Sequence, residues 1–359
     1  MKVFFDYTIF TIQRFGGISK YITSLAENFS KEIDPSIISL FYKNNYLKNS
    51  NLSGKLFFYN KVGSLVKYIN KANNIYFNYH LKNKKPDIVH LTYFDKEKLS
   101  STKAKRVITE YDLIKEKFYA EKYKDFINKK KEIFERVDQI ICISNNTKKD
   151  LQENYSIDPS KISVTHLAVN KDKSFRDKSL NIRPFILYVG SRERYKNFIN
   201  AIKAYAISSK LMSDFDFVCF GGGNFSKKEH ELFRNLSIDK NRLHYFDGDE
   251  LDLNYFYHKA RIFIFPSLYE GFGLPLLEAM NMECPVICSN IGSFSEIIND
   301  AAIFFDPTDI ESMKYKMEKL IFDDQLLLDL KKRGNKNIDK YSWKKCSNET
   351  EQLYKKILI

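Results

Sequence analysis

Two glutamates, Glu270 and Glu278, bracket a break between an apolar run and a helical pattern in this 359-residue chain. The residues after Glu270 read Gly-Phe-Gly-Leu-Pro, and such residues end a strand and begin a helix. Helical side chains lean toward the N-terminus, so the Glu278 carboxylate can reach a ligand held at the start of the helix. A carboxylate accepts two adjacent hydroxyl groups, as a ribose diol offers, and Glu270 can meet another part of the same ligand.

The backbone between the two glutamates supplies the other half of this predicted site. Pro275 fits the first helical position, where its missing N–H costs nothing. The amides just before it then lie at a helix N-terminus, which favours anions and hydroxyl groups. They belong to Gly271, Phe272, Gly273 and Leu274. For so short a string, an ordinary strand-to-helix turn with two solvated acids is the alternative.

A basic loop follows the apolar run Phe185–Val189 and carries Arg192, Arg194 and Lys196. Cationic side chains beside the start of a helix can bind a diphosphate without a metal ion. No Asp-x-Asp string typical of metal-dependent sugar transferases follows a convincing strand, and Asp247-Gly-Asp249 fits a turn better. We therefore expect no metal site and no bound cofactor, and we expect the diphosphate to belong to a substrate.

Glycines recur beside other apolar runs. Gly16 and Gly17 follow the first predicted strand and precede a helix, where missing Cβ atoms let the backbone approach a phosphate or a sugar. Gly222 lies in the string Cys219-Phe-Gly-Gly-Gly223, at the end of another strand. A few glycines on their own are more typical of turns than of binding sites, so these positions gain weight only from a longer pattern.

The glutamate pair, the basic loop and the glycine strings together resemble the family 4 glycosyltransferases, which are retaining enzymes of the GT-B fold. Matching strings extend from Phe15-Gly-Gly-Ile-Ser-Lys-Tyr21 to Asp300-Ala-Ala-Ile-Phe-Phe-Asp-Pro307. They are most specific over residues 185–307. The resemblance therefore spans nearly the whole chain.

This resemblance implies roles for several residues. Arg192 and Lys196 would grip the diphosphate of a nucleotide-sugar donor, and Glu270 would lie at the catalytic centre beside them. Gly17 would border the donor phosphates and the acceptor. Gly222 would lie beside the nucleotide base.

The string Thr109-Glu-Tyr-Asp112 departs from the family, because many members have histidine where this chain has Tyr111. A tyrosine donates a hydrogen bond but carries protons poorly near neutral pH, so an acid or base role at residue 111 stays open. The position of the string still makes Tyr111 and Asp112 candidates at the catalytic centre. His90 ends an apolar strand and is a candidate for contact with the acceptor, with a structural histidine as the alternative.

Composition indicates a globular protein of two domains. The chain is too long for one ordinary core and suits two domains of roughly 170 residues each. No apolar run approaches the roughly 18 residues of a membrane helix, and Asp6 interrupts any signal-like segment. The five cysteines lack the spacing of a zinc site or a disulfide framework, so we expect a cytoplasmic protein.

The net charge of +13 is concentrated in the first half of the chain. Residues 1–180 hold 33 Lys and Arg against 20 Asp and Glu, whereas residues 181–359 hold 25 against 25. Within the first half, residues 36–86 contain no acid and interleave aromatic residues with lysines. These lysines include Lys43, Lys55, Lys61, Lys67 and Lys71.

Lysines attract lipid phosphates and amphipathic aromatic side chains settle at the lipid boundary, so residues 36–86 predict contact with an anionic membrane. We therefore expect a peripheral protein on the inner face of the cytoplasmic membrane. A solvated basic surface is the alternative. A nucleic-acid partner is disfavoured, because no helix-turn-helix, zinc-finger or RNA-binding sheet pattern accompanies the charge.

Apolar runs alternate with helical patterns through both halves, which is typical of α/β proteins with parallel sheets and crossover helices. The polar segment 170–183 indicates a linker that ends at Pro184. We expect a Rossmann-like domain at residues 1–170, completed by a returning C-terminal helix at residues 341–359, and a second such domain at residues 184–340. Their loops should face a shared cleft, because ligands bind at the carboxyl ends of parallel strands.

The alternation also predicts individual elements. Strands are expected at Val3–Tyr7, Ile37–Tyr42, Ile88–Thr92, Arg106–Glu110, Gln139–Ser144, Ile162–His166, Phe185–Val189, Phe215–Phe220, Leu243–Phe246, Ile262–Phe265, Val286–Ser289 and Ile303–Phe305. Helices are expected at Ile18–Phe29, Glu116–Arg136, Asn197–Ser208, Lys228–Leu236, Asn254–Lys259 and Leu274–Met280.

These observations favour a retaining glycosyltransferase that needs no metal ion. It would move a hexose, with GDP-mannose as the first choice of donor, to a lipid-linked or oligosaccharide acceptor in bacterial O-antigen (lipopolysaccharide) or capsule synthesis. A GT-B sugar epimerase or phosphorylase is the second hypothesis, although no cofactor lysine or free-phosphate site is identifiable. A non-catalytic lipid-binding protein of the same fold is the third, and it would have lost Glu270, Glu278 and Lys196.

Overall fold

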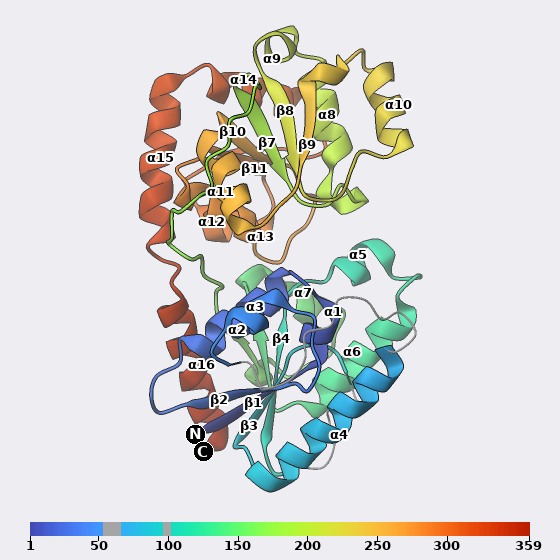
Figure 1. Ribbon diagram of the computed structural model, residues 1–359, viewed down its shortest axis with the longest axis vertical. Coiled ribbons are helices and arrows are strands. Elements are labelled where there is room, and N and C mark those ends of the chain that lie inside the picture. The colour runs from blue at the N-terminus through green and yellow to red at the C-terminus, as the bar shows by residue number, and fades with distance from the viewer. Residues whose placement is uncertain (53–65, 96–101) are drawn as a thin grey trace. The chain divides into compact units, whose positions relative to one another are not determined.

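The computed structural model describes residues 1–52, 66–95 and 102–359, and the chain divides into two compact units (Figure 1). Unit 1 comprises Met1–Ala168 together with Ser342–Ile359, and unit 2 comprises Val169–Tyr341. Each unit is an α/β structure with its own parallel sheet. In the described parts of the chain, no helix is both long enough and apolar enough to cross a membrane.

Unit 1 has the sheet order β2-β1-β3-β4-β5-β6. Its described strands are β1 Lys2–Asp6, β2 Asp34–Ile38, β3 Ile88–Leu91, β4 Lys105–Glu110, β5 Gln139–Cys142 and β6 Ile162–Val164. Its described helices are α1 Thr8–Ile12, α2 Gly17–Glu27, α3 Asn45–Asn49, α4 Val66–Lys84, α5 Ile114–Tyr119, α6 Lys124–Arg136, α7 Asn145–Asn154 and α16 Trp343–Leu358.

Unit 2 has the sheet order β12-β11-β10-β7-β8-β9. Its strands are β7 Phe185–Val189, β8 Asp216–Phe220, β9 Leu243–Phe246, β10 Ile262–Phe265, β11 Val286–Ser289 and β12 Ile303–Phe305. Its helices are α8 Phe198–Ala206, α9 Ser209–Asp214, α10 Lys227–Asn235, α11 Glu250–Lys259, α12 Leu274–Asn281, α13 Gly292–Ile298, α14 Ile310–Ile321 and α15 Asp324–Ile338.

The strands of unit 2 follow the prediction closely, and β7, β9, β10, β11 and β12 have the predicted bounds. Every residue of β7, β8, β10 and β11 is buried. A strand covered on both faces reads as an unbroken apolar run, which a sequence shows clearly. The fold class predicted from the alternation, two Rossmann-like α/β units, is confirmed.

Unit 1 departs from the prediction more often, and its short helices α1, α3 and α7 were not predicted. The second strand is Asp34–Ile38, several residues earlier than expected. The helix expected at Glu116–Arg136 is divided between α5 and α6. The helix α4, at Val66–Lys84, was not predicted, because tyrosine, isoleucine and lysine share its exposed face and hide the usual alternation of polar and apolar positions.

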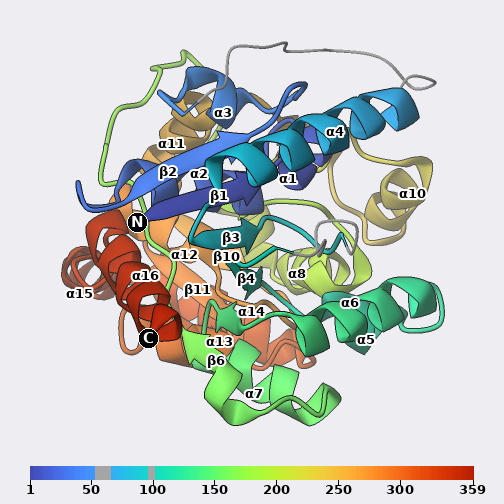
Figure 2. The same ribbon diagram turned by 90° about the horizontal axis from the view of Figure 1, so that it is seen from below.

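The last helix of the chain, α16, belongs to unit 1, and Figure 2 shows it well separated from α4, which contacts β2. Glu351 on α16 accepts hydrogen bonds from the backbone and the hydroxyl group of Ser30. Ser347 Oγ donates to the carbonyl oxygen of Asn28 at 2.7 Å. These contacts join the end of the described chain to its beginning.

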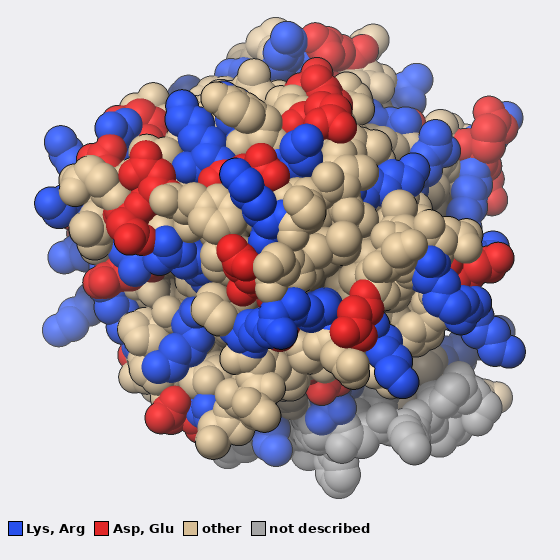
Figure 3. All heavy atoms as spheres, turned by 90° about the horizontal axis from the view of Figure 1, so that it is seen from above, with Lys and Arg blue, Asp and Glu red and all other residues tan. Residues whose placement is uncertain are grey.

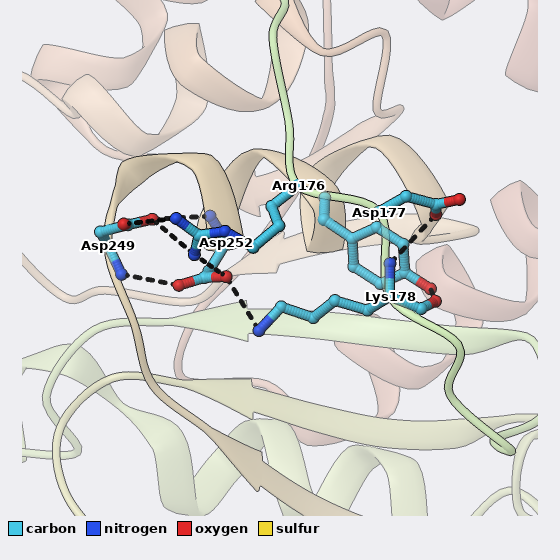
Figure 4. Close-up of polar contacts among 6 residues, drawn as sticks. Arg176, Asp177, Lys178, Asp249 and Asp252 are labelled. Carbon is cyan, nitrogen blue, oxygen red and sulfur yellow. Dashed lines mark hydrogen bonds and ion pairs between the residues drawn. The ribbon is translucent and has the colours of Figure 1, made fainter.

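The segment between Val169 and β7 has no regular secondary structure but is fastened to unit 2 (Figure 4). The Arg176 guanidinium binds Asp249 and Asp252, which also cap α11, and Lys178 Nζ lies 2.9 Å from Asp252 Oδ1. Burial opposes ionisation of Asp252, but the bonds from Lys178 and Arg176 outweigh it and lower the pKa of that carboxyl. The predicted linker is therefore held against the start of α11.

Candidate functional site

In unit 2, the loops that carry the predicted donor residues meet at one place along the sheet. β7 lies between β8 and β10, so the order of the strands reverses between β7 and β10. Ligands of parallel sheets bind beyond the carboxyl ends of the strands at such a reversal. The loop after β7 leads to Lys196, and the loop after β10 leads to Glu270. The fold thus brings together two segments that the sequence singled out.

Lys196 and Glu270 form an ion pair at this reversal. Lys196 Nζ lies 2.6 Å from Glu270 Oε1, which also accepts a hydrogen bond from Ser267 Oγ at 2.7 Å. The two charged side chains are 15% and 13% exposed, so both stay within reach of solvent. A diphosphate that arrived here would compete with the Glu270 carboxylate for the ammonium group, because both are anions that accept its hydrogen bonds.

The turn that presents Lys196 is fixed by its backbone. Arg194–Lys196 forms a single 3-10 turn, and Asn197 then adopts a left-handed conformation with φ of 56° before α8 begins. Asparagine tolerates this conformation better than most residues. Asn197 Nδ2 donates to the carbonyl oxygen of Pro307 at 2.7 Å, which ties the turn to the segment after β12.

After Glu270 the chain enters α12 at a position that requires glycine. Gly273 has φ of 99°, and a Cβ atom there would lie 2.9 Å from side-chain atoms of Leu276 and of Phe294. The helix begins at Leu274, so Pro275 is its second residue, one place later than predicted. The sharp entry into α12 is therefore set by both backbone conformation and packing.

The other predicted donor residues lie on the same segment. The Glu270 carbonyl accepts a hydrogen bond from Ser293 Oγ at 2.7 Å, which holds the start of the segment to α13. Phe272 is 2% exposed and its ring packs against Tyr341, so it can offer a ligand its backbone but not its ring. Glu278 is half-buried on α12. The contacts that these residues and Gly271 would make with a donor stay predictions.

Arg192 has partners within the protein that the sequence did not indicate. Its guanidinium donates to the carbonyl oxygens of Gly221, Gly223 and Asn224 at 3.2, 2.6 and 3.0 Å and pairs with Glu229. The side chain is only 6% exposed. The predicted role of Arg192 is to grip a phosphate. In this structure its guanidinium instead holds the loop after β8.

Gly222 has a structural reason to be glycine. Its φ is 76°, and a Cβ atom would lie 2.6 Å from the carbonyl oxygen of Gly190. The loops after β7 and β8 therefore press against each other at this residue. A contact between Gly222 and a nucleotide base stays a prediction.

In unit 1, the predicted glycine pair does not follow the first strand directly, because α1 lies between them. Gly16 is the N-cap of α2 and has an extended backbone with φ of 170°. Gly17 begins α2, and a Cβ atom there would meet nothing within 4 Å. Neither glycine is needed for a left-handed turn, so contact with a ligand stays the predicted reason for Gly17.

Unit 1 also has a strand reversal, between β1 and β3, but a side chain of the protein fills it. Asp6 is fully buried at the end of β1. Its carboxylate accepts hydrogen bonds at 2.7 Å from the backbone N–H of Thr8 and from that of Thr92. Backbone donors that would be open to a ligand at such a reversal are thus occupied by Asp6.

The predicted acceptor contact of His90 is wrong, and the structural alternative holds. His90 is fully buried, with Nδ1 2.6 Å from the Tyr354 hydroxyl and Nε2 2.9 Å from Thr109 Oγ1. Burial lowers the pKa of His90 to about 3. A neutral histidine with both nitrogens engaged links β3 and β4 to α16 and cannot reach a ligand.

Tyr111 and Asp112 lie at the carboxyl end of β4. Tyr111 is 8% exposed, its ring packs edge-on against Tyr21, and burial raises the pKa of its hydroxyl well above the ordinary value. A proton-transfer role for Tyr111 near neutral pH is therefore disfavoured. Asp112 Oδ1 accepts from the N–H of Ile114 at 3.0 Å, and both predicted residues line a cavity of about 100 Å³.

Comparisons with known proteins fit this geometry. The family described as Glycosyltransferase Family 4 matches residues 15–173, and the family described as Glycosyl transferases group 1 matches residues 170–337. The chain belongs to the family 4 glycosyltransferases. Its two parallel α/β units are those of the GT-B fold, as solved glycosyltransferase structures of this architecture also show.

Curated relatives of this family 4 chain include mannosyltransferases. It is 28% identical over 229 residues to the O-antigen chain mannosyltransferase B of Escherichia coli, and the matched region covers 60% of each protein. It is 29% identical over 288 residues to the serotype-specific mannosyltransferase WbdA of Escherichia coli, and this matched region covers 72% of the chain and 35% of WbdA. The matches thus span less than two thirds of these relatives.

A solved structure of Anabaena HepE in complex with UDP and glucose superposes with a TM-score of 0.76. The identity is 13%, and the superposition covers 98% of this chain and 99% of HepE. At this level of identity the likeness shows the fold of the family 4 chain.

Among the residues that the structure describes, no group of three or more His, Cys, Asp and Glu side chains could hold a metal ion.

One buried charge of this family 4 glycosyltransferase was not predicted. Lys130 on α6 is 2% exposed, and its ammonium group lies 2.9 Å from Glu110 and 2.7 Å from Glu116. In the sequence it stands in a run of three lysines, which suggests a solvated surface. The signal that could have found it is helical spacing, because residue 130 falls on the same face as the apolar residues Phe126 and Ile133.

The predicted membrane lysines fall into three groups. Lys67 and Lys71 are exposed on α4. Lys43 is half-buried in the segment between β2 and α3. Lys55 and Lys61 lie outside the described residues.

Proposed function

We propose that this family 4 protein is a retaining, metal-independent glycosyltransferase that moves a hexose to a lipid-linked or oligosaccharide acceptor of a bacterial surface polysaccharide. The observation that carries this proposal is the Lys196–Glu270 pair at the strand reversal of unit 2. The O-antigen mannosyltransferases among its relatives support mannose as the sugar and GDP-mannose as the donor. The HepE complex, which holds UDP and glucose in the same fold, supports a nucleotide-sugar donor.

The chemistry of transfer explains why such a pair is useful. When the bond between sugar and diphosphate breaks, negative charge grows on the diphosphate while the sugar passes through an oxocarbenium-like state. The Lys196 ammonium and the N-terminus of α12 can stabilise the departing diphosphate. A retaining outcome follows when the acceptor hydroxyl attacks from the face that the diphosphate leaves: the new glycosidic bond forms as the sugar–diphosphate bond breaks, and the hydroxyl proton passes to an oxygen of the departing diphosphate.

Nucleotide binding tests the donor site directly. Calorimetric titration of the purified protein with GDP, UDP, ADP and dTDP, each with and without Mg²⁺, is expected to give one tight binder whose affinity does not depend on the metal. Lys196→Ala should weaken that nucleotide at least about tenfold, because a charge-assisted bond to phosphate is lost. Glu278→Ala should abolish its binding.

A matched control separates the site from the general charge of unit 2. Lys203→Ala removes a lysine from α8, two turns beyond the Lys196 loop, and should leave nucleotide affinity unchanged. Equal affinity in wild type, Lys196→Ala and Glu278→Ala would contradict the assignment of this donor site. Absence of binding by every nucleotide would favour a non-catalytic protein.

The membrane part of the proposal rests on α4. Tyr68, Ile75 and Tyr79 share one face of this helix and are 69%, 65% and 63% exposed. Lys71 and Lys82 flank that face and are also exposed. Exposed aromatic and apolar side chains beside lysines fit the boundary of an anionic bilayer. The face drawn in Figure 3 shows acidic and basic side chains intermixed, so it offers no comparable basic area.

Vesicle sedimentation tests this surface. The protein is expected to sediment with phosphatidylglycerol vesicles and not with phosphatidylcholine vesicles. A Tyr68→Ser, Ile75→Ser, Tyr79→Ser variant and a separate Lys71→Glu, Lys82→Glu variant should both stay in the supernatant. The control variant Tyr315→Ser, Leu328→Ser removes exposed apolar side chains from unit 2 and should sediment like wild type. Unaltered sedimentation of both α4 variants would exclude α4 as the contact.

A further inference from the structure

The cavity of about 100 Å³ in unit 1 is built from segments that are distant in the sequence. Tyr93 and Phe94 come from the loop after β3, Glu110 from the end of β4, Lys115 from α5 and Phe126 from α6. The volume corresponds to roughly three water molecules, given about 30 Å³ for each in the liquid. It therefore suits one edge of a small ring, with the rest of the ligand outside.

The floor of the cavity is a buried cluster of charges. Lys130 lies between the carboxylates of Glu110 and Glu116, and these side chains are 2%, 1% and 6% exposed. Glu116 Oε1 also accepts a hydrogen bond from the Tyr155 hydroxyl at 2.6 Å. Glu116 Oε2 is buried but has no hydrogen-bond partner among the described residues. A buried carboxylate oxygen without a donor is costly, and a ligand hydroxyl would supply one.

One wall of the cavity is aromatic. The rings of Tyr93 and Phe94 lie 5.9 and 5.6 Å from the ring of Phe126. Lys115 Nζ lies 3.4 Å from the centre of the Phe126 ring and donates to the Tyr93 hydroxyl at 2.8 Å. The wall therefore offers apolar surface, and its lysine is already engaged.

The charges of the cavity nearly cancel. The carboxyl groups of Glu110, Asp112 and Glu116 face the ammonium groups of Lys115 and Lys130. Burial raises the pKa of Glu110 to about 7, although Lys130 opposes the shift. A phosphate would meet carboxylates and lysines that already have partners. A neutral ligand with hydroxyl donors and an apolar side fits better.

We propose that this cavity binds an uncharged hexose residue of the acceptor, with the apolar side of the sugar against the aromatic wall and a hydroxyl donating to Glu116 Oε2. The inference rests on the proposed glycosyl transfer and names the part of unit 1 that takes the acceptor. Asp112, which also lines the cavity, is then placed to contact the same sugar. The surroundings of the cavity come wholly from unit 1.

Saturation-transfer NMR with methyl α-D-mannopyranoside and the full-length protein tests the proposal. Wild type should transfer saturation to the ring protons of the sugar. Phe126→Leu should weaken the sugar about fivefold by removing aromatic contact, and Glu116→Gln about tenfold by removing the charged acceptor. Phe118→Leu changes a half-buried phenylalanine of α5 outside the cavity and should bind like wild type. Melting curves confirm that each variant is folded.

Two outcomes would overturn the inference. The first is a sugar signal that is absent from wild type or equal in wild type, Phe126→Leu and Glu116→Gln. The second is displacement of the sugar by inorganic phosphate, which would mean that the site prefers an anion. GDP titration of the same samples separates this inference from the proposed function: nucleotide binding without sugar binding refutes the cavity alone, whereas sugar binding at the cavity without nucleotide binding refutes the donor assignment alone.

Discussion

The two units place different groups at corresponding points of their sheets. At the reversal between β7 and β10, unit 2 presents a solvent-accessible ion pair, Lys196–Glu270, on loops shaped by glycines. At the reversal between β1 and β3, unit 1 presents Asp6. Its carboxylate occupies this position and accepts hydrogen bonds from the backbone N–H groups of Thr8 and Thr92. The polar residues of unit 1 instead gather one strand away, after β4, around the buried Lys130.

This difference teaches how one architecture can hold two kinds of site. In unit 2, backbone conformation at Gly222 and Gly273 brings loops close together, and the charged side chains stay available to a ligand. In unit 1, contacts between side chains bring the segments together, and Lys130, Glu110 and Glu116 are buried next to one another. Damage to unit 1 should therefore appear first as lost stability, whereas damage to unit 2 should appear more as lost binding.

The largest expected effect comes from breaking the buried cluster of unit 1. Lys130→Met keeps much of the volume of the side chain but leaves Glu110 and Glu116 without their cation. The free energy of unfolding should fall by about 3–5 kcal/mol, the usual cost of leaving a buried charge unpaired. Urea unfolding measures this cost. Lys129→Met changes the exposed neighbour and should alter stability little; equal midpoints for the two variants would mean that the cluster contributes no such stability.

The next effect concerns the glycine loop of unit 2. Gly222 and Gly223 both have positive φ, but a Cβ atom at Gly222 would overlap Gly190, whereas one at Gly223 meets nothing within 4 Å. Gly223→Ala should cost about 1–2 kcal/mol of conformational strain. Gly222→Ala should cost about 2–4 kcal/mol and weaken nucleotide binding, because the two loops must move apart. Equal unfolding free energies for the two variants would show that the close approach does not matter.

A third effect is the acid sensitivity of unit 1. His90 is neutral in the folded protein because burial lowers its pKa to about 3, while the unfolded chain binds a proton below about pH 6.5. The contribution of neutral His90 to the free energy of unfolding is complete above pH 6.5. It is lost as the pH falls toward 3, by about 1.4 kcal/mol per pH unit.

The variant His90→Gln isolates this effect, because glutamine can bond to Tyr354 and Thr109 but does not titrate. The difference in unfolding free energy between wild type and variant should shrink steadily below pH 6.5. The raised pKa of Glu110 gives the opposite slope as the pH rises from its ordinary value toward 7, but it is common to both proteins and cancels in the difference. A difference that is constant with pH would mean that His90 has the same pKa in the folded protein as in the unfolded chain.

The smallest expected effect concerns the ion pair of unit 2. Glu270→Gln removes the anion that competes for Lys196, so inorganic pyrophosphate should bind about fivefold more tightly, as a solvent-accessible ion pair worth about 1 kcal/mol allows. The same variant should weaken a nucleotide sugar, if Glu270 contacts the sugar. Lys196→Ala, Glu270→Gln together should lose the gain. Pyrophosphate affinity that is unchanged in Glu270→Gln would show that Glu270 does not restrain Lys196.

The contrast between the units also explains what the sequence could predict. In unit 2 the strands are unbroken apolar runs, and Lys196 and Glu270 follow them in short loops, so their meeting at the sheet edge could be anticipated from topology. Arg192 could not be assigned in this way, because its partners are carbonyl oxygens that become available only when three successive glycines adopt positive φ.

In unit 1 the decisive contacts join residues that are distant in the sequence. His90 looked accessible at the end of a strand, and only Tyr354, 264 residues later, explains its burial. Lys130 looked solvated, and only Glu110 and Glu116 explain its position in the core. Periodicity predicts which residues share a face, but it does not predict which distant charge is opposite them.

The membership of α16 in unit 1 has a consequence for the order in which the protein is made. Unit 2 is a continuous stretch of chain, whereas unit 1 is interrupted by it and completed by Ser342–Ile359. Domains usually fold from the N-terminus onward during synthesis. Here Ser30, which is translated before unit 2, can bond to Glu351 only after unit 2 has been translated, so unit 1 is expected to finish folding after unit 2.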